Sequence, residues 1–518
     1  MRDGLLELVD GIRCYHARYL DYLRSVNADE KLISALEQVP MKPARDIYEA
    51  VLSWNFVMYL DGCDDLGCVA SGLAPYHNGE DIVPLLDNLY DNLDINNGYS
   101  MALHGDEVDL TLQCLEACKG KRRPQVELLV DEKTPDIIWK KAFECMRTNN
   151  GQPAFYNKKV LYNGLAKKFP RINKADLKKF CGVGCTESSL SGLSNVGSGD
   201  SGVNVLWILS KYIFENFADT EDFESFYQGF LKKIYAETNY GLESISKSQL
   251  DRAKYSPLPM RTLLIDDCID KGLDFNNDGP RYGWSLVYFA ALSNVIDSLL
   301  VIRDFVFREK RYTKKQFAGM LFQNNEEFLN ECRNHPIHHG IDNEDANELA
   351  NRLTTDIYSY LDDKKPAIGD AFVPAAIMFR SMAIHGKNVP ATPDGRRAGE
   401  PLADSLGAVL GKDTKGPTAL LKSVTSMNLE RALGIPVLNF RIDPDITDEN
   451  MKALMLTYMD LGGIQMQVTC INSEILMEAY ENPELHRNLV IRVGGYSDYF
   501  CNLSDELKDT VIKRNVHK

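Results

Sequence analysis

Short apolar runs alternate with longer stretches of helical periodicity in the C-terminal part of the chain, and this alternation constrains the fold more than any other feature. Apolar and β-branched residues predict strands at 419–427, 437–442, 464–470 and 490–493. The segments 448–461 and 473–480 carry apolar residues at helical spacing. Strands that alternate with helices predict an α/β architecture.

The rest of the chain continues this pattern. Residues 125–130 form the clearest early strand, and 153–157 are a shorter one. Helical periodicity covers 5–36, 47–60, 82–93, 108–117, 202–217, 223–239, 281–307 and 326–362. The segment 281–307 is apolar on nearly every side, which predicts a buried helix, whereas 188–195 reads as a polar loop. Because no repeat or low-complexity linker appears and 44% of the 518 residues are hydrophobic, we expect one folding unit with a large core.

Charge and cysteine content narrow the class of protein. The net charge of −16 argues against nucleic acid or an anionic membrane as partner. Asp3 and Glu7 interrupt any apolar leader, and no apolar run is long enough to span a bilayer. The 12 cysteines are too sparse for a disulfide scaffold and lack paired metal-ligand spacing, so we expect no metal site and a reducing cytoplasm.

Two glycine-containing loops are candidates for chemistry. Near the C-terminus, an apolar run enters the pair Gly494-Gly495 and leaves through Tyr496, which by itself predicts a buried tight turn. Far upstream, Cys185 and Glu187 lie two residues apart in a glycine-flanked loop. Taken alone, such a cysteine is more often an inert buried thiol, and such a glutamate is equally well a solvated loop acid.

Together with the segments 276–282, 392–404 and 463–467, these loops resemble the glycyl radical enzymes, the family of pyruvate formate-lyase and the anaerobic dehydratases. The resemblance implies a ten-stranded α/β barrel of two half-barrels, with the cysteine and glycine loops meeting inside and helices around them. It divides the chain into a pyruvate formate-lyase-like domain, 1–397, and a glycine radical domain, 398–518. Family members usually carry a few hundred more residues ahead of the cysteine loop, so the chain is a short member or lacks its start.

The resemblance also implies roles for individual residues. Gly495 would store a radical, installed by a separate iron–sulfur, S-adenosylmethionine-dependent activating enzyme, with no small-molecule cofactor bound. A backbone radical is stabilised by the neighbouring amide nitrogen and carbonyl, and it requires a dry interior. Cys185 would relay the radical to the substrate, and Glu187 would act as acid and base. Asp200 and His104 are weaker candidates for contacts with substrate hydroxyl groups.

The residues around the thiol favour one reaction class. In pyruvate formate-lyase the corresponding loop has two adjacent cysteines, whereas here Gly184 and Thr186 flank Cys185, so formate C-acetyltransferase activity is disfavoured. A carboxylate at Glu187 suits radical elimination, by a dehydratase or a related C–O or C–N lyase acting on a small polar substrate. An arylacetate-type radical decarboxylase is the alternative within the family, and a truncated inactive binding partner is the non-enzymatic one. The resemblance implies a homodimer.

Overall fold

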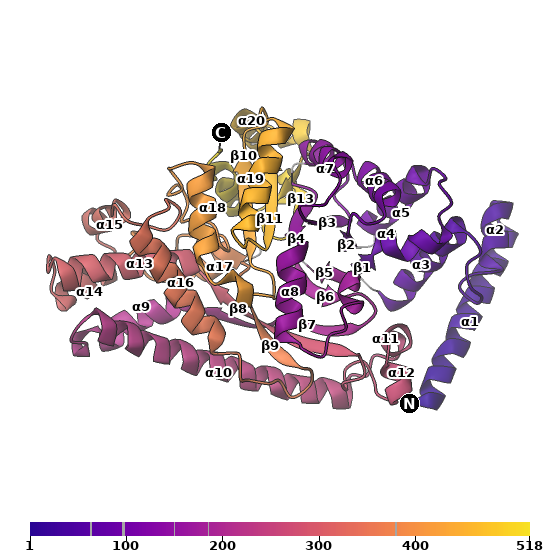
Figure 1. Cartoon of the computed structure of the whole chain (residues 1–518), viewed down its shortest axis with the longest axis horizontal. Helices are drawn as coiled ribbons and strands as arrows, with labels where there is room; N and C mark the ends of the chain where they lie inside the picture. The colour runs from indigo at the N-terminus through magenta and orange to yellow at the C-terminus, as the bar shows by residue number, and fades with distance from the viewer. Residues whose placement is uncertain (63–64, 96–98, 150, 185, 379–380, 518) are drawn as a thin grey trace.

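The computed structural model (Figure 1) describes residues 1–62, 65–95, 99–149, 151–184, 186–378 and 381–517. Its largest sheet has six strands in the order β1-β2-β3-β4-β11-β10. The bounds are β1 (Asp65–Cys68), β2 (Ser100–Leu103), β3 (Gln125–Val130), β4 (Ala154–Asn157), β11 (Gln465–Cys470) and β10 (Val437–Ile442). Strands β1 to β4 are parallel, β4 and β11 are antiparallel, and β11 and β10 are parallel.

A second, parallel sheet contains β7 (Ser194–Asn204), β8 (Tyr282–Ala290) and β9 (Ala371–Ala375). Backbone hydrogen bonds from Gly434 N to Pro374 O (3.0 Å) and from Val437 N to Ala376 O (3.1 Å) join the end of β9 to β10. The described strands therefore form one series, from β1 through β4, β11 and β10 to β9, β8 and β7. Within it, β1 to β4 run opposite to the other five strands.

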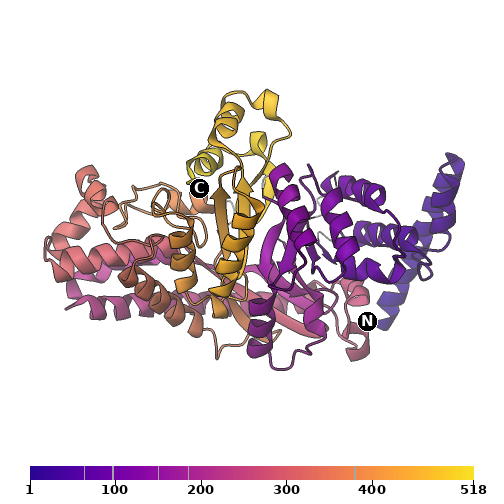
Figure 2. The ribbon, with the colours of Figure 1, turned by 45° about the horizontal axis from the view of Figure 1, so that its top comes forward.

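Helices surround these strands. Figures 1 and 2 place α1 to α6 toward one end of the molecule and α9 and α13 to α16 toward the other, and in Figure 1 the long α10 runs along the lower edge from that second end past the middle. Their bounds are α1 (Arg2–Ser25), α2 (Glu30–Leu36), α3 (Ile47–Asp61), α4 (Val69–Leu73), α5 (Val83–Ile95), α6 (Val108–Ala117), α7 (Asp136–Asn149), α8 (Lys158–Lys168), α9 (Val205–Asn216), α10 (Phe223–Tyr255), α11 (Pro259–Leu264), α12 (Cys268–Lys271), α13 (Leu292–Ile302), α14 (Lys314–Phe322), α15 (Glu326–Arg333), α16 (Glu344–Ser359), α17 (Ser381–Lys387), α18 (Pro417–Ser426), α19 (Asp448–Asp460), α20 (Ser473–Glu481) and α21 (Asp505–Lys513). Among the described residues, no helix is both long and apolar enough to span a membrane.

Several sequence predictions are confirmed and others are wrong. Strand 125–130 and helix 108–117 have the predicted bounds. Residues 281–307 were predicted as one buried helix, but they form β8 and then α13, all of whose residues are buried. A run that is apolar on every side suits a buried strand and a buried helix equally well, and pairing with β7 and β9 decides for the strand.

Two further corrections concern segments with turn residues. Residues 419–426 of the predicted strand 419–427 belong to helix α18, and Met427 caps its end; Pro417 at the first position is preorganised for a helix. Residues 188–195 are not a polar loop but contribute to strand β6 (Glu187–Leu190) and to the start of β7. The predicted helix 202–217 begins only at Val205, because the Asn204 side chain caps it by accepting a hydrogen bond from Trp207 N.

Candidate active site

The cysteine loop is the tip of a β-hairpin. Strands β5 (Phe180–Val183) and β6 pair antiparallel; after the last pair, Val183 with Glu187, the described residues Gly184 and Thr186 are turn residues. Cys185 itself lies outside the described residues. Its neighbours are fixed: Gly184 has a φ of 58°, and its N–H donates to Asp65 Oδ1 at 3.0 Å. Thr186 is completely buried, so the described part of the tip points into the protein.

Glu187 is a buried acid at this tip, with 1% of its surface exposed. Its Oε1 accepts hydrogen bonds from Tyr288 OH (2.8 Å) and from Ser198 Oγ, and its Oε2 accepts one from Thr186 N (2.9 Å). Burial and the nearby Glu187 carboxylate raise the pKa of Tyr288, so the phenol stays a donor. The alternative of a solvated loop acid is therefore wrong.

The glycine loop is a second buried turn. It joins β12 (Val490–Arg492) to β13 (Ser497–Tyr499), and Val493 N donates to Tyr496 O at 2.9 Å. Gly495 is buried and has a φ of 88°, a conformation that side-chain-bearing residues rarely adopt. Its N–H donates to Gln467 Oε1 (3.3 Å), and its carbonyl accepts from Arg492 Nη2 (3.1 Å). The sequence prediction of a buried tight turn is confirmed.

Two arginines hold this loop. On the inner side, the buried Arg492 guanidinium also donates to Gln125 on β3 and to Gln467 on β11. On the outer side, Arg514 after α21 donates to the carbonyls of Arg492 (3.2 Å) and Val493, and it pairs with Asp404 at 2.8 Å. Sequence reasoning assigned neither arginine a role, because Gln125, the partner of Arg492, and Asp404, the partner of Arg514, are far away in the chain.

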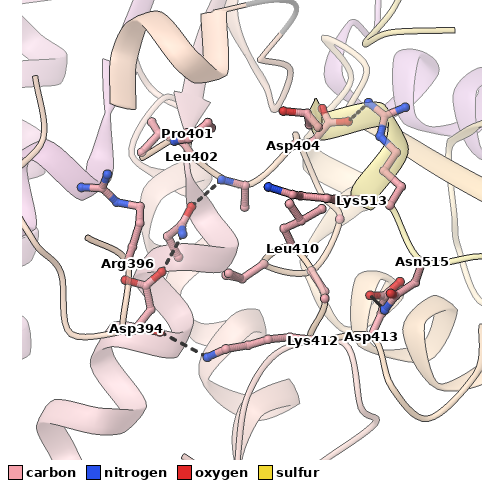
Figure 3. Close-up of a pocket in the computed structure, with 18 of the residues that line it drawn as sticks. Asp394, Arg396, Pro401, Leu402, Asp404, Leu410, Lys412, Asp413, Lys513 and Asn515 are labelled. Atoms are coloured by element: carbon pink, nitrogen blue, oxygen red, sulfur yellow. Dashed lines mark hydrogen bonds and ion pairs between the residues drawn. The ribbon is translucent and has the colours of Figure 1, made fainter. Parts of the chain in front are cut away.

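A pocket of about 370 Å³ lies beside the outer arginine. Figure 3 shows its walls, which include Asp404, Lys412 and Lys513, and Arg514 also lines it. None of the described residues of the cysteine hairpin contributes to it. It therefore lies away from the described residues of the cysteine hairpin and does not qualify as the reaction site.

Strand β3 brings the two loops together. Gln125 contacts Arg492 of the glycine loop, and Glu127 accepts a hydrogen bond from Gly182 N of the cysteine hairpin. Residues i and i+2 of a strand point to the same face and lie about 7 Å apart. The described parts of the two loops thus meet on one interior face of the sheet, as expected from the family resemblance.

Two adjoining pockets open next to the hairpin. The first, of about 480 Å³, is lined by residues that include Asp65, Gly184, Ser198 and Arg261. The second, of about 300 Å³, shares Ser198 and Arg261 with the first and adds Asp200. Asp200 lies 3.4 Å from Arg252, and its Oδ2 atom is buried with no hydrogen-bond partner among the described residues.

His104 lies at the base of the hairpin. Its ring is 3% exposed; Nε2 is 2.7 Å from Phe180 O, and Nδ1 is 3.1 Å from Tyr162 OH. The ring lines neither pocket, and its contact with a substrate stays a prediction. Cys68 Sγ lies 3.5 Å from Nε2. A hydrogen bond with the Cys181 thiol, aided by His104 and opposed by burial, lowers the pKa of Cys68 to about 6.

The sequence matches two known family models. Residues 108–385 match the family described as pyruvate formate lyase-like, and residues 402–501 match the glycine radical family. The first match alone covers more than half of the chain. The chain belongs to the pyruvate formate lyase-like, glycyl radical enzyme family.

Among the similar proteins are a dehydratase and a decarboxylase. The trans-4-hydroxy-L-proline dehydratase of Clostridioides difficile is 28% identical over 414 residues, covering 76% of this chain and 52% of the relative. An indoleacetate decarboxylase of Tractidigestivibacter scatoligenes is 24% identical over 447 residues, covering 76% of this chain and 50% of the relative. The chain thus spans about half the length of these curated relatives.

A solved structure shows the fold. The structure reported for 1,2-propanediol dehydration in Roseburia inulinivorans superposes with a TM-score of 0.91 at 23% identity, covering 99% of this chain and 74% of that one. This likeness confirms the predicted α/β barrel fold, of which the described strands form nine in series. The boundary between 397 and 398 and the roles of Gly495, Cys185 and Glu187 stay predictions.

Proposed function

We propose that this chain catalyses radical elimination, as a dehydratase or a related C–O or C–N lyase, on a small polar substrate. The observation that carries the proposal is the shared face of β3. A buried carboxylate, Glu187, ends the hairpin, and a buried glycine, Gly495, lies in a loop attached to the same strand. Radical elimination uses both a buried backbone glycine and a buried acid.

The surroundings of Gly495 fit a stored radical. Its Cα lies between an N–H bound to Gln467 and a carbonyl bound to Arg492, and both groups are fixed in a dry interior that protects a radical from solvent and oxygen. The radical, once installed by an S-adenosylmethionine-dependent iron–sulfur activating enzyme, supplies the unpaired electron for each turnover. Gly495 needs no bound small-molecule cofactor for this role.

The chain's own residues then divide the chemistry. The Cys185 sulfur, as a thiyl, takes a hydrogen atom from a substrate C–H and becomes a thiol. Glu187 accepts the proton of the substrate hydroxyl group, and the neighbouring C–O or C–N bond breaks as the leaving group takes a proton. The product radical recovers a hydrogen atom from the thiol, so the net change is loss of water or an amine, without net oxidation.

The pocket beside the hairpin suits a small, hydroxylated molecule. Its volume is about 480 Å³, and Asp65 and Ser198 supply polar walls. Asp200, whose Oδ2 atom has no partner in the described part of the chain, is placed to accept a hydrogen bond from a substrate that reaches the second pocket. We assign His104 an indirect role in substrate binding, in which it supports the hairpin through its contact with Phe180 O.

A radical decarboxylase is the second candidate, and one observation favours it. Arg252 and Arg261 line the second pocket, where either could bind a substrate carboxylate. Their existing partners, Asp200 and Asp61, lie at 3.4 and 3.3 Å, which are long ion pairs. Formate C-acetyltransferase activity stays disfavoured, because Gly184 and Thr186, and not a second cysteine, flank Cys185. The buried Glu187 and Gly495 argue against an inactive binding partner.

The setting follows from the chemistry. A radical of this kind requires an anaerobic, reducing compartment, so we place the protein in the cytoplasm with its activating enzyme as partner. We expect a homodimer, no nucleic-acid partner and no membrane partner. We retain the division into residues 1–397, which hold the thiol, and 398–518, which hold Gly495.

A substrate panel tests the proposal. The chain is activated anaerobically and incubated separately with diols, hydroxylated amino acids, amino alcohols and arylacetates, and products are read by mass spectrometry. We expect the wild-type chain to release water or an amine from a substrate. Glu187→Gln should react roughly 10²- to 10⁴-fold more slowly, and Cys185→Ala should form no product. The matched control, Glu132→Gln, changes an exposed glutamate and should act like wild type. Release of carbon dioxide alone would support the decarboxylase, and an activated chain inert to the whole panel would contradict catalysis.

A further inference from the structure

Glu127 is a buried acid that the proposed reaction does not use. It stands in the middle of β3 and is 2% exposed. Its Oε2 accepts the N–H of Gly182, and its Oε1 lies 3.4 Å from Tyr156 OH. A Cβ atom at Gly182 would lie 2.0 Å from Oε1. The carboxyl group therefore packs directly on the hairpin backbone, and only glycine fits beneath it.

The neighbouring position on the same face holds the other loop. Gln125 accepts a hydrogen bond from Arg492, which donates to the carbonyl of Gly495 at 3.1 Å. β3 itself is fixed between β2 and β4 and is buried along its whole length. The anchors of the two loops are consecutive inward-facing residues, about 7 Å apart, on a strand that is paired on both sides.

We propose that β3 sets the spacing between the glycine and the thiol, and that Glu127 is the positioning residue for the hairpin that carries Cys185. The inference rests on the proposed function, because it concerns hydrogen transfer between these two residues. Transfer of a hydrogen atom needs near-contact of donor and acceptor, and a misplacement of about 1 Å can cost roughly 100-fold in rate. Removing Glu127 takes away the hydrogen bond between the hairpin and β3 without touching either reacting residue.

The charge state of Glu127 supports this role. Burial, with further contributions from Asp65 and Glu187, raises its pKa well above the ordinary value, against the lowering effects of the Gly182 N–H and Arg492. A neutral carboxyl group can accept the hydrogen bond from Gly182 N with one oxygen and donate a hydrogen bond with its hydroxyl group. Glutamine offers the same acceptor and a donor at the same length, so it should substitute for the acid.

Hydrogen exchange at the radical tests the proposal without a known substrate. The thiol hydrogen exchanges with solvent, so in D₂O a thiol that reaches the glycine replaces its remaining α-hydrogen, and the doublet in the electron paramagnetic resonance spectrum collapses. We expect Glu127→Ala to form the radical in wild-type yield but to lose the doublet about 100-fold more slowly. Glu127→Gln should restore the rate, and Glu49→Ala, which removes a buried glutamate of α3, should not change it.

The outcomes distinguish a failure of the positioning role of Glu127 from a failure of the proposed function. Glu127→Asp, which keeps the acid but shortens it, should also slow the collapse, and it serves if the alanine variant does not fold. Wild-type exchange in folded Glu127→Ala and Glu127→Asp would overturn the positioning role. So would a loss of radical yield with unchanged exchange of the remaining radicals. A wild-type chain that forms no doublet would instead contradict the proposed function itself, and this inference with it.

Discussion

Removing the Arg514 side chain should release the glycine loop from outside. Arg514 and Asp404 are 11% and 13% exposed and pair at 2.8 Å, and Arg514 also binds the carbonyls of Arg492 and Val493. Breaking a buried pair by deleting one partner costs about 3–5 kcal/mol. If Arg514→Ala lowers the free energy of local opening of the glycine loop by that amount, the open population of the loop should rise roughly 100- to 3,000-fold.

Amide hydrogen exchange read by mass spectrometry on the peptide 490–500 measures this opening directly. The matched control is Lys513→Ala, because Lys513 is 58% exposed and pairs with Asp509 across the surface, where such pairs contribute about 0–1 kcal/mol. The peptide covering the buried helix α13 reports global stability in each variant. Unchanged exchange of 490–500 in Arg514→Ala, or an equal change in Lys513→Ala, would show that Arg514 does not hold the glycine loop closed.

Three further predictions concern the hairpin and its base. Because the pKa of Glu127 is raised in the folded chain, its stabilising effect is complete below the unfolded pKa of about 4.3 and is lost as pH rises toward the folded value. In urea titrations, wild type should therefore lose about 1.4 kcal/mol per pH unit relative to Glu127→Gln over that range; a difference independent of pH would argue against a neutral acid. Gly182→Ala should destabilise by about 1–3 kcal/mol or more, since its Cβ would meet Glu127, whereas a Cβ at Gly202 meets nothing within 4 Å and Gly202→Ala should have little effect in the same titration. The rate at which Cys68 is alkylated should rise with pH with a midpoint near pH 6. Peptide mapping measures this rate, and the exposed Cys14 serves as the reference for reagent reactivity. A midpoint near 8.5, the ordinary thiol value, would show that the Cys68 thiol is unperturbed.

Local patterns in the sequence were sufficient for much of the fold. Alternation and β-branched residues predict β3 with its observed bounds, and helical spacing does the same for α6. The segment 281–307 could not be divided correctly, because a uniformly apolar run has no periodicity to read. Its first part becomes strand β8 only through pairing with β7 and β9, which are far away in sequence.

The site shows the same division. Gly495 and Glu187 stand in short motifs that could be found from the chain alone. Their setting could not: Arg492 binds Gln125 across 367 residues, and Glu127 binds Gly182 across 55. One signal for Glu127 was present in the sequence, because a glutamate within the apolar run 125–130 has to be buried with partners or face a cavity.

Electron paramagnetic resonance followed by exposure to air tests the central claim, that Gly495 holds the radical, most directly. After anaerobic activation we expect a doublet, and none in Gly495→Ala. Oxygen should then cut the main chain at the radical, so mass spectrometry should find a C-terminal fragment of residues 495–518. An activated chain that stays intact in air, or one that breaks elsewhere, would contradict the assignment of the radical to Gly495.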